Sequence, residues 1–198
     1  ARELNMSAIA ITDHGVMYGV ADFYRKVREA GVKPIIGCEL YVAPGKMTDK
    51  TREMKEYSHL VLLAKNNEGY KNLMRLSSIG FTEGFYHKPR IDYDVLERHK
   101  DGLICLSACL AGDIPRLIMA GDREGAERLA LRLRDMFRED FYLELQDHQL
   151  PEQKIVNAAL IEMARSLSIP LVATNDTHYT YREDAEAQDV LLCIQTRS

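Results

Sequence analysis

Short apolar runs alternate along the chain with segments whose apolar residues recur every three or four positions. The apolar runs predict six β-strands, at residues 7–11, 33–42, 59–64, 102–106, 141–145 and 170–174. Helical spacing predicts a helix that ends near Gly31 and four more, over 66–79, 113–137, 151–167 and 182–194, while 80–93 is predicted to be irregular. Strands interleaved with helices indicate an α/β fold, in one domain, with a mainly parallel sheet or barrel.

One connection differs from the others. A polar loop over 44–57, without helical spacing, joins the strand at 33–42 to the strand that starts at His59. A parallel return needs a crossover, usually a helix, whereas an antiparallel return needs only a loop. We therefore predict an antiparallel pair, in which His59 lies beside the end of the previous strand, within about 10 Å of Glu39.

Composition narrows the class of protein. The 198 residues include 26 Lys and Arg against 30 Asp and Glu, a net charge of −4, and 46% are hydrophobic. These values are ordinary for a globular protein, and no apolar run reaches the roughly 20 residues that span a bilayer. Four cysteines in apolar runs, without CxxC spacing, indicate a reducing, cytoplasmic compartment. The mild acidity disfavours nucleic-acid binding by bulk electrostatics, so phosphate chemistry here would need metal ions.

Side chains that bind metals occur where the predicted strands end. His14 follows the first strand, Cys109 follows the strand from 102, and Asp176 and His178 follow the last, while Glu39 lies within the second. The C-terminal ends of parallel strands meet at one rim, where α/β proteins carry their functional sites. Asp176 and His178 are separated by one residue, so both can face one cluster. The sequence therefore predicts a site for several metal ions at this rim.

The residue types fit a particular chemistry. Imidazole with carboxylate suits Zn²⁺, Mn²⁺ or Fe ions, and bridging carboxylates suit paired ions. Such clusters activate water at neutral pH and bind phosphate oxygens, as in metal-assisted phosphoester hydrolysis. Cys109 would add a soft ligand, since a bound metal lowers a thiol's pKa.

Structural roles compete with this hypothesis at each single position. A lone His at a strand end is more often a surface residue than a ligand, and Asp13 and Asn175 fit helix N-caps. Cys38, Cys105 and Cys193 are predicted to be core residues. Glu39 is harder to assign to structure alone, because a carboxylate inside an apolar strand needs a partner. The coincidence of positions, and no single residue, supports the metal site.

The same residues form motifs that resemble those of the PHP (polymerase and histidinol phosphatase) domain. In chain order the motifs are Thr12–Gly15, Lys33–Glu39, Ser58–Leu60, Leu106–Leu110 and Asn175–Tyr179. Three further segments resemble the PHP domain of the bacterial replicative DNA polymerase III alpha subunit: Gly84–Asp92, Leu150–Lys154 and Ala187–Gln195. The resemblance covers essentially the whole chain, and the ordered set of motifs makes it specific.

The resemblance implies a distorted (β/α)7 barrel of the PHP type with up to three divalent metal ions (Zn, Mn or Fe) at one rim. Carried over by position, the implied metal ligands are His14, Glu39, His59, Cys109, Asp176 and His178. It also implies a metal-dependent 3′–5′ exonuclease that acts on DNA ends. We expect Arg90, and less strongly Lys88, to contact substrate phosphate, and His148 to support a ligand or contact substrate.

The chain departs from the family pattern at its start. The family begins with a strand that carries a His-x-His motif and then an acidic ligand, ahead of the segment matching Thr12–Gly15, and these are absent here. We therefore expect residues 1–198 to be a partial, N-terminally truncated PHP domain that binds metal weakly and has little nuclease activity. A polymerase core, which uses Mg²⁺, would follow residue 198.

Two other functions stay open at this point. A PHP domain can be a non-catalytic scaffold that stabilises the polymerase and docks a separate proofreading exonuclease, but all six expected ligands are present here. A free-standing PHP phosphoesterase is the third hypothesis, and the segments Gly84–Asp92 and Leu150–Lys154 argue against it. The expected partners are DNA and other polymerase III subunits, with no membrane.

Overall fold

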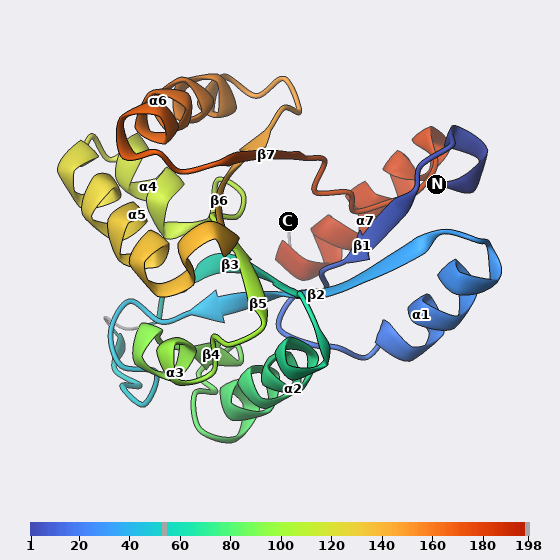
Figure 1. Ribbon diagram of the computed structural model, residues 1–198, viewed down its shortest axis with the longest axis horizontal. Coiled ribbons are helices and arrows are strands. Elements are labelled where there is room, and N and C mark those ends of the chain that lie inside the picture. Colours follow the sequence, from blue (N-terminus) through green and yellow to red (C-terminus); the bar gives the residue numbers. More distant parts are fainter. Residues whose placement is uncertain (53–54, 197–198) are drawn as a thin grey trace.

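The computed structural model describes residues 1–52 and 55–196, and its elements alternate between strands and helices (Figure 1). The strands are β1 (Ala8–Ile11), β2 (Lys33–Val42), β3 (Ser58–Ala64), β4 (Arg90–Ile91), β5 (Leu103–Leu106), β6 (Phe141–Gln146) and β7 (Leu171–Thr174). The α-helices are α1 (Val20–Glu29), α2 (Asn67–Thr82), α3 (Tyr93–Arg98), α4 (Asp113–Met119), α5 (Arg123–Phe137), α6 (Pro151–Leu167) and α7 (Ala185–Thr196). Short 3₁₀ helices lie at Arg2–Leu4, Arg138–Asp140 and Arg182–Asp184.

The strands form one curled sheet in the order β1-β2-β3-β5-β6-β7, with β4 added beside β2. β3 is antiparallel to both of its neighbours, and the other pairs are parallel. This confirms the α/β class, the mainly parallel sheet and the antiparallel return into β3. Among the described residues β1 does not pair with β7, so the sheet is a partial, distorted barrel that stays open between its edge strands (Figure 1).

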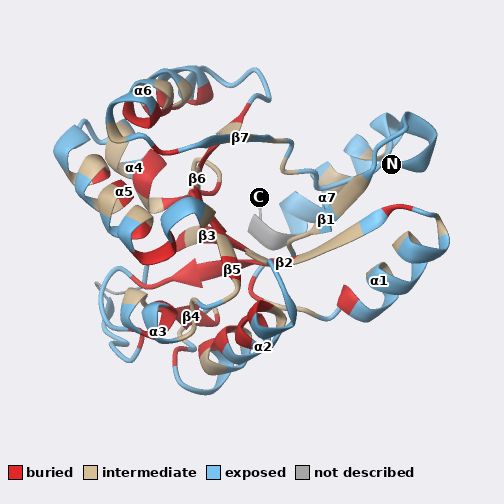
Figure 2. Ribbon diagram, viewed as in Figure 1, coloured by how far each residue is buried: buried red, intermediate tan, exposed pale blue. Residues whose placement is uncertain are grey.

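Alternate residues along the strands serve two different faces. Cys38, Leu40 and Val42 of β2 belong to the main core under the helices, together with Leu62 of β3 and Phe141 of β6. The residues between them face the inside of the curl, where a smaller apolar cluster contains Val61, Leu106 and Ala108. Figure 2 shows buried residues in β2, β3, β5 and β6 and on parts of α2, α4, α5 and α6, while β7, α1 and α7 are more exposed.

The structure corrects the predicted elements in three places. The segment 80–93, expected to be irregular, contains the end of α2 and the two-residue strand β4, and α3 follows directly. The helix predicted over 113–137 is two helices, α4 and α5, because Gly121 has a positive φ of 78° and the Asp122 side chain caps α5 by accepting from Gly125 N. Cys193, expected in the core, is exposed on α7, whereas Cys38 and Cys105 are fully buried.

No helix within 1–52 and 55–196 is long and apolar enough to cross a membrane.

Candidate metal centre

His14 and Glu39 are brought together where the chain beyond β1 continues to pair with β2. Gly15 N donates to Glu39 O at 2.8 Å and Glu39 N donates to Asp13 O at 3.0 Å, so His14 lies directly beside Glu39. Gly15 is suited to this turn: its φ is 68°, and an added Cβ would lie 2.9 Å from the Tyr41 ring. His14 Nδ1 lies 2.7 Å from Glu39 Oε1.

His59 reaches the same carboxylate from the antiparallel strand. In the register of β2 and β3, His59 pairs with Tyr41. Its Nδ1 lies 2.7 Å from Glu39 Oε1, well within the separation expected from the sequence. The three candidate ligand atoms of His14, Glu39 and His59 all lie within 4.8 Å of one another.

Glu39 lies at ion-pair distance from two imidazoles, and the same three groups are suited to bind a metal ion. Glu39 is 3% exposed, and its Oε1 has no hydrogen-bond donor among the described residues, although two imidazole nitrogens lie 2.7 Å away. A buried carboxylate oxygen without a donor is costly. Two nitrogens and one oxygen that converge without hydrogen-bond geometry are a donor set that a divalent ion would complete.

The electrostatics agree with an ionised Glu39. Burial alone would raise its pKa, but the contacts with His14 and His59 outweigh burial and lower the pKa to about 2. In return, the contact with Glu39 raises the pKa of His14 above its ordinary value, although burial opposes this. Glu39 is therefore a carboxylate, as a metal ligand must be, and in the metal-free protein His14 gains from being protonated.

Cys109 follows β5 and meets His59. Its Sγ lies 3.5 Å from His59 Nδ1, and the preceding Ala108 has a left-handed φ of 66° that turns the chain toward the centre. Burial, and then the nearby Glu39 carboxylate, raise the pKa of the Cys109 thiol to about 12. Binding of a metal at Cys109 would therefore release a proton.

Asp176 and His178 approach from the end of β7. The His178 ring centre lies 5.7 Å from that of His14, and His178 Nδ1 lies 2.8 Å from Asp176 O. Asp176 has a φ of 46°, a left-handed conformation like that of Ala108. Unfavourable backbone conformations of this kind tend to cluster at functional sites. His14, Glu39 and His59 form one group, Cys109 adjoins His59, His178 adjoins His14, and Asp176 Oδ1 lies 3.9 Å from His178 Nδ1.

Lys88 lies beside this group and Arg90 does not face it. Lys88 Nζ lies 5.4 Å from the centre of the Tyr41 ring, and its charge acts on His14. Arg90 is fully buried, with its guanidinium bonded to the carbonyls of Gly84, Met47 and Asp49. The prediction that Arg90 contacts substrate phosphate is wrong. The guanidinium is buried, and its hydrogen bonds link the 44–52 loop to the turn before β4.

His148 supports the end of β7 through the backbone. Gln153 Nε2 donates to His148 Nδ1 at 2.9 Å, which leaves the proton on Nε2, and Nε2 donates to the carbonyl of Asn175 at 2.6 Å. Gln153 Oε1 also accepts from His148 N at 2.6 Å. The Asn175 carbonyl directly precedes Asp176, so His148 and Gln153 fix the position from which Asp176 is presented.

Sequence reasoning missed the surroundings of the cluster. Tyr57 stacks on His59, at 6.1 Å between ring centres and 9° between planes, and Tyr41 packs edge-on against both rings. Glu144 on β6, buried on the inner face, was also missed. Its signal was available, because Glu144 is a carboxylate inside an apolar strand, as Glu39 is.

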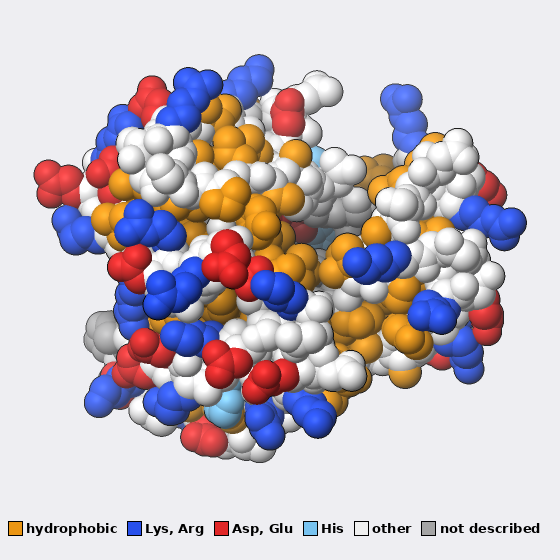
Figure 3. All heavy atoms as spheres, viewed as in Figure 1, with side chains coloured by type: hydrophobic (Ala, Val, Ile, Leu, Met, Phe, Trp, Pro, Cys, Tyr) orange, Lys and Arg blue, Asp and Glu red, His pale blue; other side chains and the backbone are white. Residues whose placement is uncertain are grey.

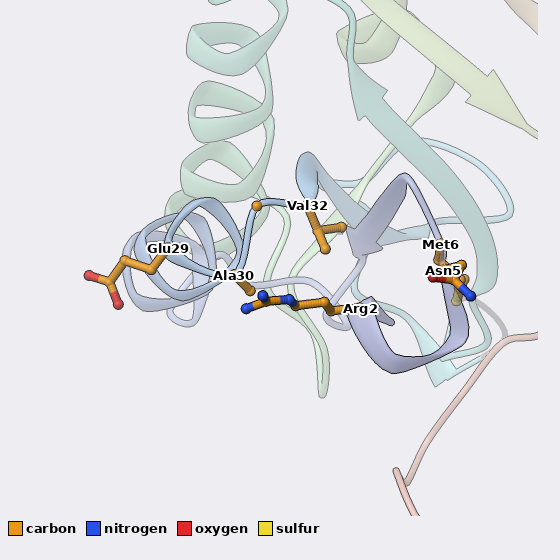
Figure 4. Close-up of a pocket in the computed structure, with 7 residues that line it drawn as sticks. Arg2, Asn5, Met6, Glu29, Ala30 and Val32 are labelled. Carbon is orange, nitrogen blue, oxygen red and sulfur yellow. The ribbon is translucent and has the colours of Figure 1, made fainter.

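The candidate ligands occupy a recess. Figure 3 shows histidine and acidic side chains within the hollow between the β7 side of the molecule and the part that carries β1 and α1. A second hollow, lined by Arg2, Asn5, Met6 and residues 29–32, lies elsewhere (Figure 4). There the Glu29 side chain points away from Arg2, and no group of converging metal ligands is present among the lining residues.

Comparisons with known proteins agree with this arrangement. A family model described as the PHP domain matches residues 1–148, which include four of the six candidate ligands. The chain belongs to the PHP domain family. Within this PHP chain, Asp176 and His178 lie beyond the matched range, just after β7, the strand that pairs with β6.

Individual relatives match the PHP chain over its whole length. The DNA polymerase III subunit alpha of Borreliella burgdorferi is 52% identical over 99% of the chain, and that of Treponema pallidum is 50% identical over 100%. The chain spans 17% of the length of each of these relatives. A solved structure of a Bifidobacterium adolescentis protein, described as a metal-dependent phosphoesterase, aligns with a TM-score of 0.40 and 13% identity, over 97% of this chain and 87% of its own.

Proposed function

We propose that residues 1–198 form the PHP region of a bacterial DNA polymerase III alpha subunit, with a larger polymerase around it. The support is 52% and 50% identity to two such subunits over nearly the whole chain, combined with a length that is 17% of theirs. The pairing of β7 with β6 supports a single unit that extends past residue 148. DNA and other subunits of the replicative polymerase are the partners that this assignment entails.

We further propose that the six-residue cluster holds divalent metal ions for hydrolysis of the terminal phosphodiester of DNA, in the 3′–5′ direction. One observation carries this proposal: Glu39 Oε1 is buried, without a hydrogen-bond donor, and 2.7 Å from two imidazole nitrogens. His14, Glu39 and His59 would hold the ions from β1–β3, and Cys109, Asp176 and His178 from β5 and β7. When bound, the ions would supply Lewis-acid stabilisation of the phosphate and activation of water.

The protein's own side chains would bind and orient the substrate at this recess. Lys88 lies over the Tyr41 ring beside His14, and among the described residues it has no carboxylate within ion-pair distance. Its ammonium is therefore available to bind a phosphate oxygen. Tyr57, stacked on His59 and half-buried, forms the neighbouring wall and restricts the angle from which a phosphate can approach.

The test uses the full-length protein that contains this chain. It is stripped of metal, reloaded with Mn²⁺ or Zn²⁺, and assayed on single-stranded DNA labelled at either end, with no deoxynucleotides present. Glu39→Gln keeps the side chain's shape but removes the charge, so metal binding and nuclease activity should fall by at least about 100-fold. Glu162→Gln, which makes the same chemical change at an exposed residue of α6, should leave both unchanged.

A second pair of variants isolates the substrate contact. Lys88→Ala should raise KM for DNA about tenfold with little change in metal binding, and Lys88→Arg should restore most of the affinity, because the positive charge returns. If Glu39→Gln retained full metal binding and full nuclease activity, the cluster would not be a hydrolytic centre. If the metal-loaded full-length protein had no nuclease activity, while its PHP region still stabilised the polymerase, the scaffold function would be favoured.

A further inference from the structure

Two polar side chains on the inner face of β6 are not among the six candidate ligands. Glu144 and Gln146 are separated by one residue, so they project from the same side of the strand. They are only 5% and 6% exposed. In the register of β6 and β7, Gln146 lies opposite Thr174, which completes a small polar group in a wall otherwise lined by Leu106, Tyr142 and Val172.

Hydrogen bonds fix the orientation of both groups. Thr174 Oγ1 donates to Glu144 Oε1 at 2.5 Å, and Gln146 Nε2 donates to the same oxygen at 3.1 Å. The amide of Gln146 cannot be reversed, because its oxygen would then face the carboxylate. This arrangement leaves Glu144 Oε2 and Gln146 Oε1 without a hydrogen-bond partner anywhere in the part of the chain that the structure describes.

The unpartnered atoms are both oxygens, one of the Glu144 carboxyl group and one of the Gln146 amide. Burial raises the pKa of Glu144, the bonds from Thr174 and Gln146 oppose this, and the carboxylates of Asp176 and Glu39 raise it further. In its ionised form Glu144 would be a buried charge, and among the described residues no Lys, Arg or His lies within ion-pair distance of it. A water molecule would satisfy the hydrogen bonds but would leave the buried charge unneutralised, whereas a cation would do both.

We propose that Glu144 Oε2 and Gln146 Oε1 are the protein ligands of a hydrated divalent cation, of the Mg²⁺ or Mn²⁺ class, at a site distinct from the six-residue cluster. Carboxylate and amide oxygens are the donors that these hard cations prefer, and such ions commonly keep several waters and use only one or two protein ligands. No nitrogen or sulfur donor is among the two, so Zn²⁺ is disfavoured. The proposal does not rest on the proposed function, because none of its ligands belongs to the cluster around Glu39.

The decisive experiment counts bound Mn²⁺ by equilibrium dialysis of the full-length protein in a His59→Ala background. His59→Ala weakens the proposed hydrolytic centre, so that ions at the second site can be counted separately. His59→Ala/Glu144→Gln should bind about one Mn²⁺ fewer per chain than His59→Ala alone. The matched control His59→Ala/Glu162→Gln, altered at an exposed glutamate that pairs with Arg123, should bind the same number as His59→Ala. Equal binding by all three proteins overturns the proposal, whatever the outcome of the nuclease assay.

A second measurement separates a ligand site from a structural network. In Glu144→Gln the new amide places an N–H where Oε2 stood, facing Gln146 Oε1, and removes the buried charge. Without metal, hydrogen exchange in residues 141–146 and 171–174 should therefore slow about tenfold, opposite to what loss of a structural contact would cause. Unchanged or faster exchange overturns the proposal.

A third variant makes the reverse prediction. Gln146→Glu keeps an oxygen at the ligand position and adds a second carboxylate, so metal-free exchange in β6 and β7 should accelerate. Added Mn²⁺ should reverse that acceleration, and Mn²⁺ affinity at this site should rise about tenfold, since affinity follows the number of charged ligands. If Mn²⁺ neither slows exchange nor binds more tightly, the two oxygens do not form a cation site.

Discussion

The two faces of the curled sheet are made by alternate residues of the same strands, yet they differ in kind. On the outer face, Cys38, Leu40 and Val42 pack under the helices in the main core. On the inner face of the same strand, Glu39 and Tyr41 lie at the candidate metal site. A strand that looks like a continuous apolar run therefore supplies core residues from one set of positions and candidate metal ligands from the other.

The two faces are stabilised in different ways. The outer face is closed by helices and buries large apolar side chains completely. The inner face has a small apolar cluster and three buried oxygens, of Glu39, Glu144 and Gln146, that lack hydrogen-bond partners among the described residues. Unsatisfied acceptors destabilise a fold, so the inner face is the part of the molecule that bound ligands would stabilise most.

The largest expected effect tests the outer face. Phe141→Ala removes a fully buried ring from the main core and should lower the free energy of unfolding by about 3–5 kcal/mol. Leu106→Ala, on the inner face, should cost about 2 kcal/mol, the low end for leucine, because the open side of the sheet can relax. Native-state hydrogen exchange measures both. If Leu106→Ala lowered the free energy of unfolding more than Phe141→Ala does, the proposed difference between the two faces would be contradicted.

Arg90 gives the next effect, because it is the one fully buried cation of the described core. Arg90→Met keeps much of the volume but leaves the carbonyls of Gly84, Met47 and Asp49 without their donor, at a cost of about 3 kcal/mol. The KM for DNA should stay within about twofold, since the guanidinium does not face the recess. A selective rise in KM, without loss of stability, would restore Arg90 as a substrate contact.

Substitution of His148 should have an intermediate effect, measured as a loss of metal affinity. His148→Ala removes the bond to the Asn175 carbonyl, so Asp176 and His178 lose their fixed position and metal affinity should fall about 10–100-fold. Gln153→Ala should reproduce part of this loss, because it frees the imidazole. His99→Ala, at a histidine outside the recess, is the control, and equal losses from His148→Ala and His99→Ala would remove the positioning role.

The smallest expected effect is a pH dependence of the metal-free protein. The pKa of Glu39 falls from 4.5 to about 2, so its stabilisation is fully present above pH 4.5 and is lost as the pH falls toward 2. The pKa of His14 is raised above 6.5, so its stabilisation is present below pH 6.5 and is lost as the pH rises through the raised value. The contact should therefore stabilise most between pH 4.5 and 6.5.

The stabilisation by the His14–Glu39 contact is small, because the His14 side chain is 42% exposed and water screens its charge. Thermal melts across pH in a chelating buffer measure it, and Glu39→Gln should flatten the profile. A profile that Glu39→Gln leaves unchanged would show that other groups dominate.

Sequence patterns predicted most of the strands and the antiparallel pairing at β3, because apolar runs and a polar loop without helical spacing are local signals. They also placed His59 beside Glu39. They could not reveal β4, because a two-residue strand has no period of its own and exists only through its pairing with Tyr41 and Val42 of β2. The burial of Arg90 follows from that pairing, so its role was predicted wrongly.

Glu144 was missed for a different reason. Residues 141–145 were predicted to be an apolar strand, and the carboxylate within it was not weighed as the one at Glu39 was. That Glu144 and Gln146 share one face became clear only from the observed strand, which extends to Gln146. Cys193 shows the opposite error: apolar neighbours predicted burial, whereas Val190, Leu191 and Ile194 around it are exposed together with it. Composition around a residue does not determine which side of a helix meets another element.

The order of the ligands along the chain has a consequence for synthesis on the ribosome. His14 follows β1, Glu39 lies in β2 and His59 in β3, so all three lie before Ala64, where β3 ends, and their mutual contacts involve no later residue. Asp176 and His178 arrive only after β6 and α6 have emerged. Because short-range contacts form before long-range ones, we expect the nascent chain to assemble half of its cluster early and to hold it until β7 is added. An ion bound by these three residues during translation would cross-link the segment after β1 to β2 and β3 before the remaining ligands are synthesised.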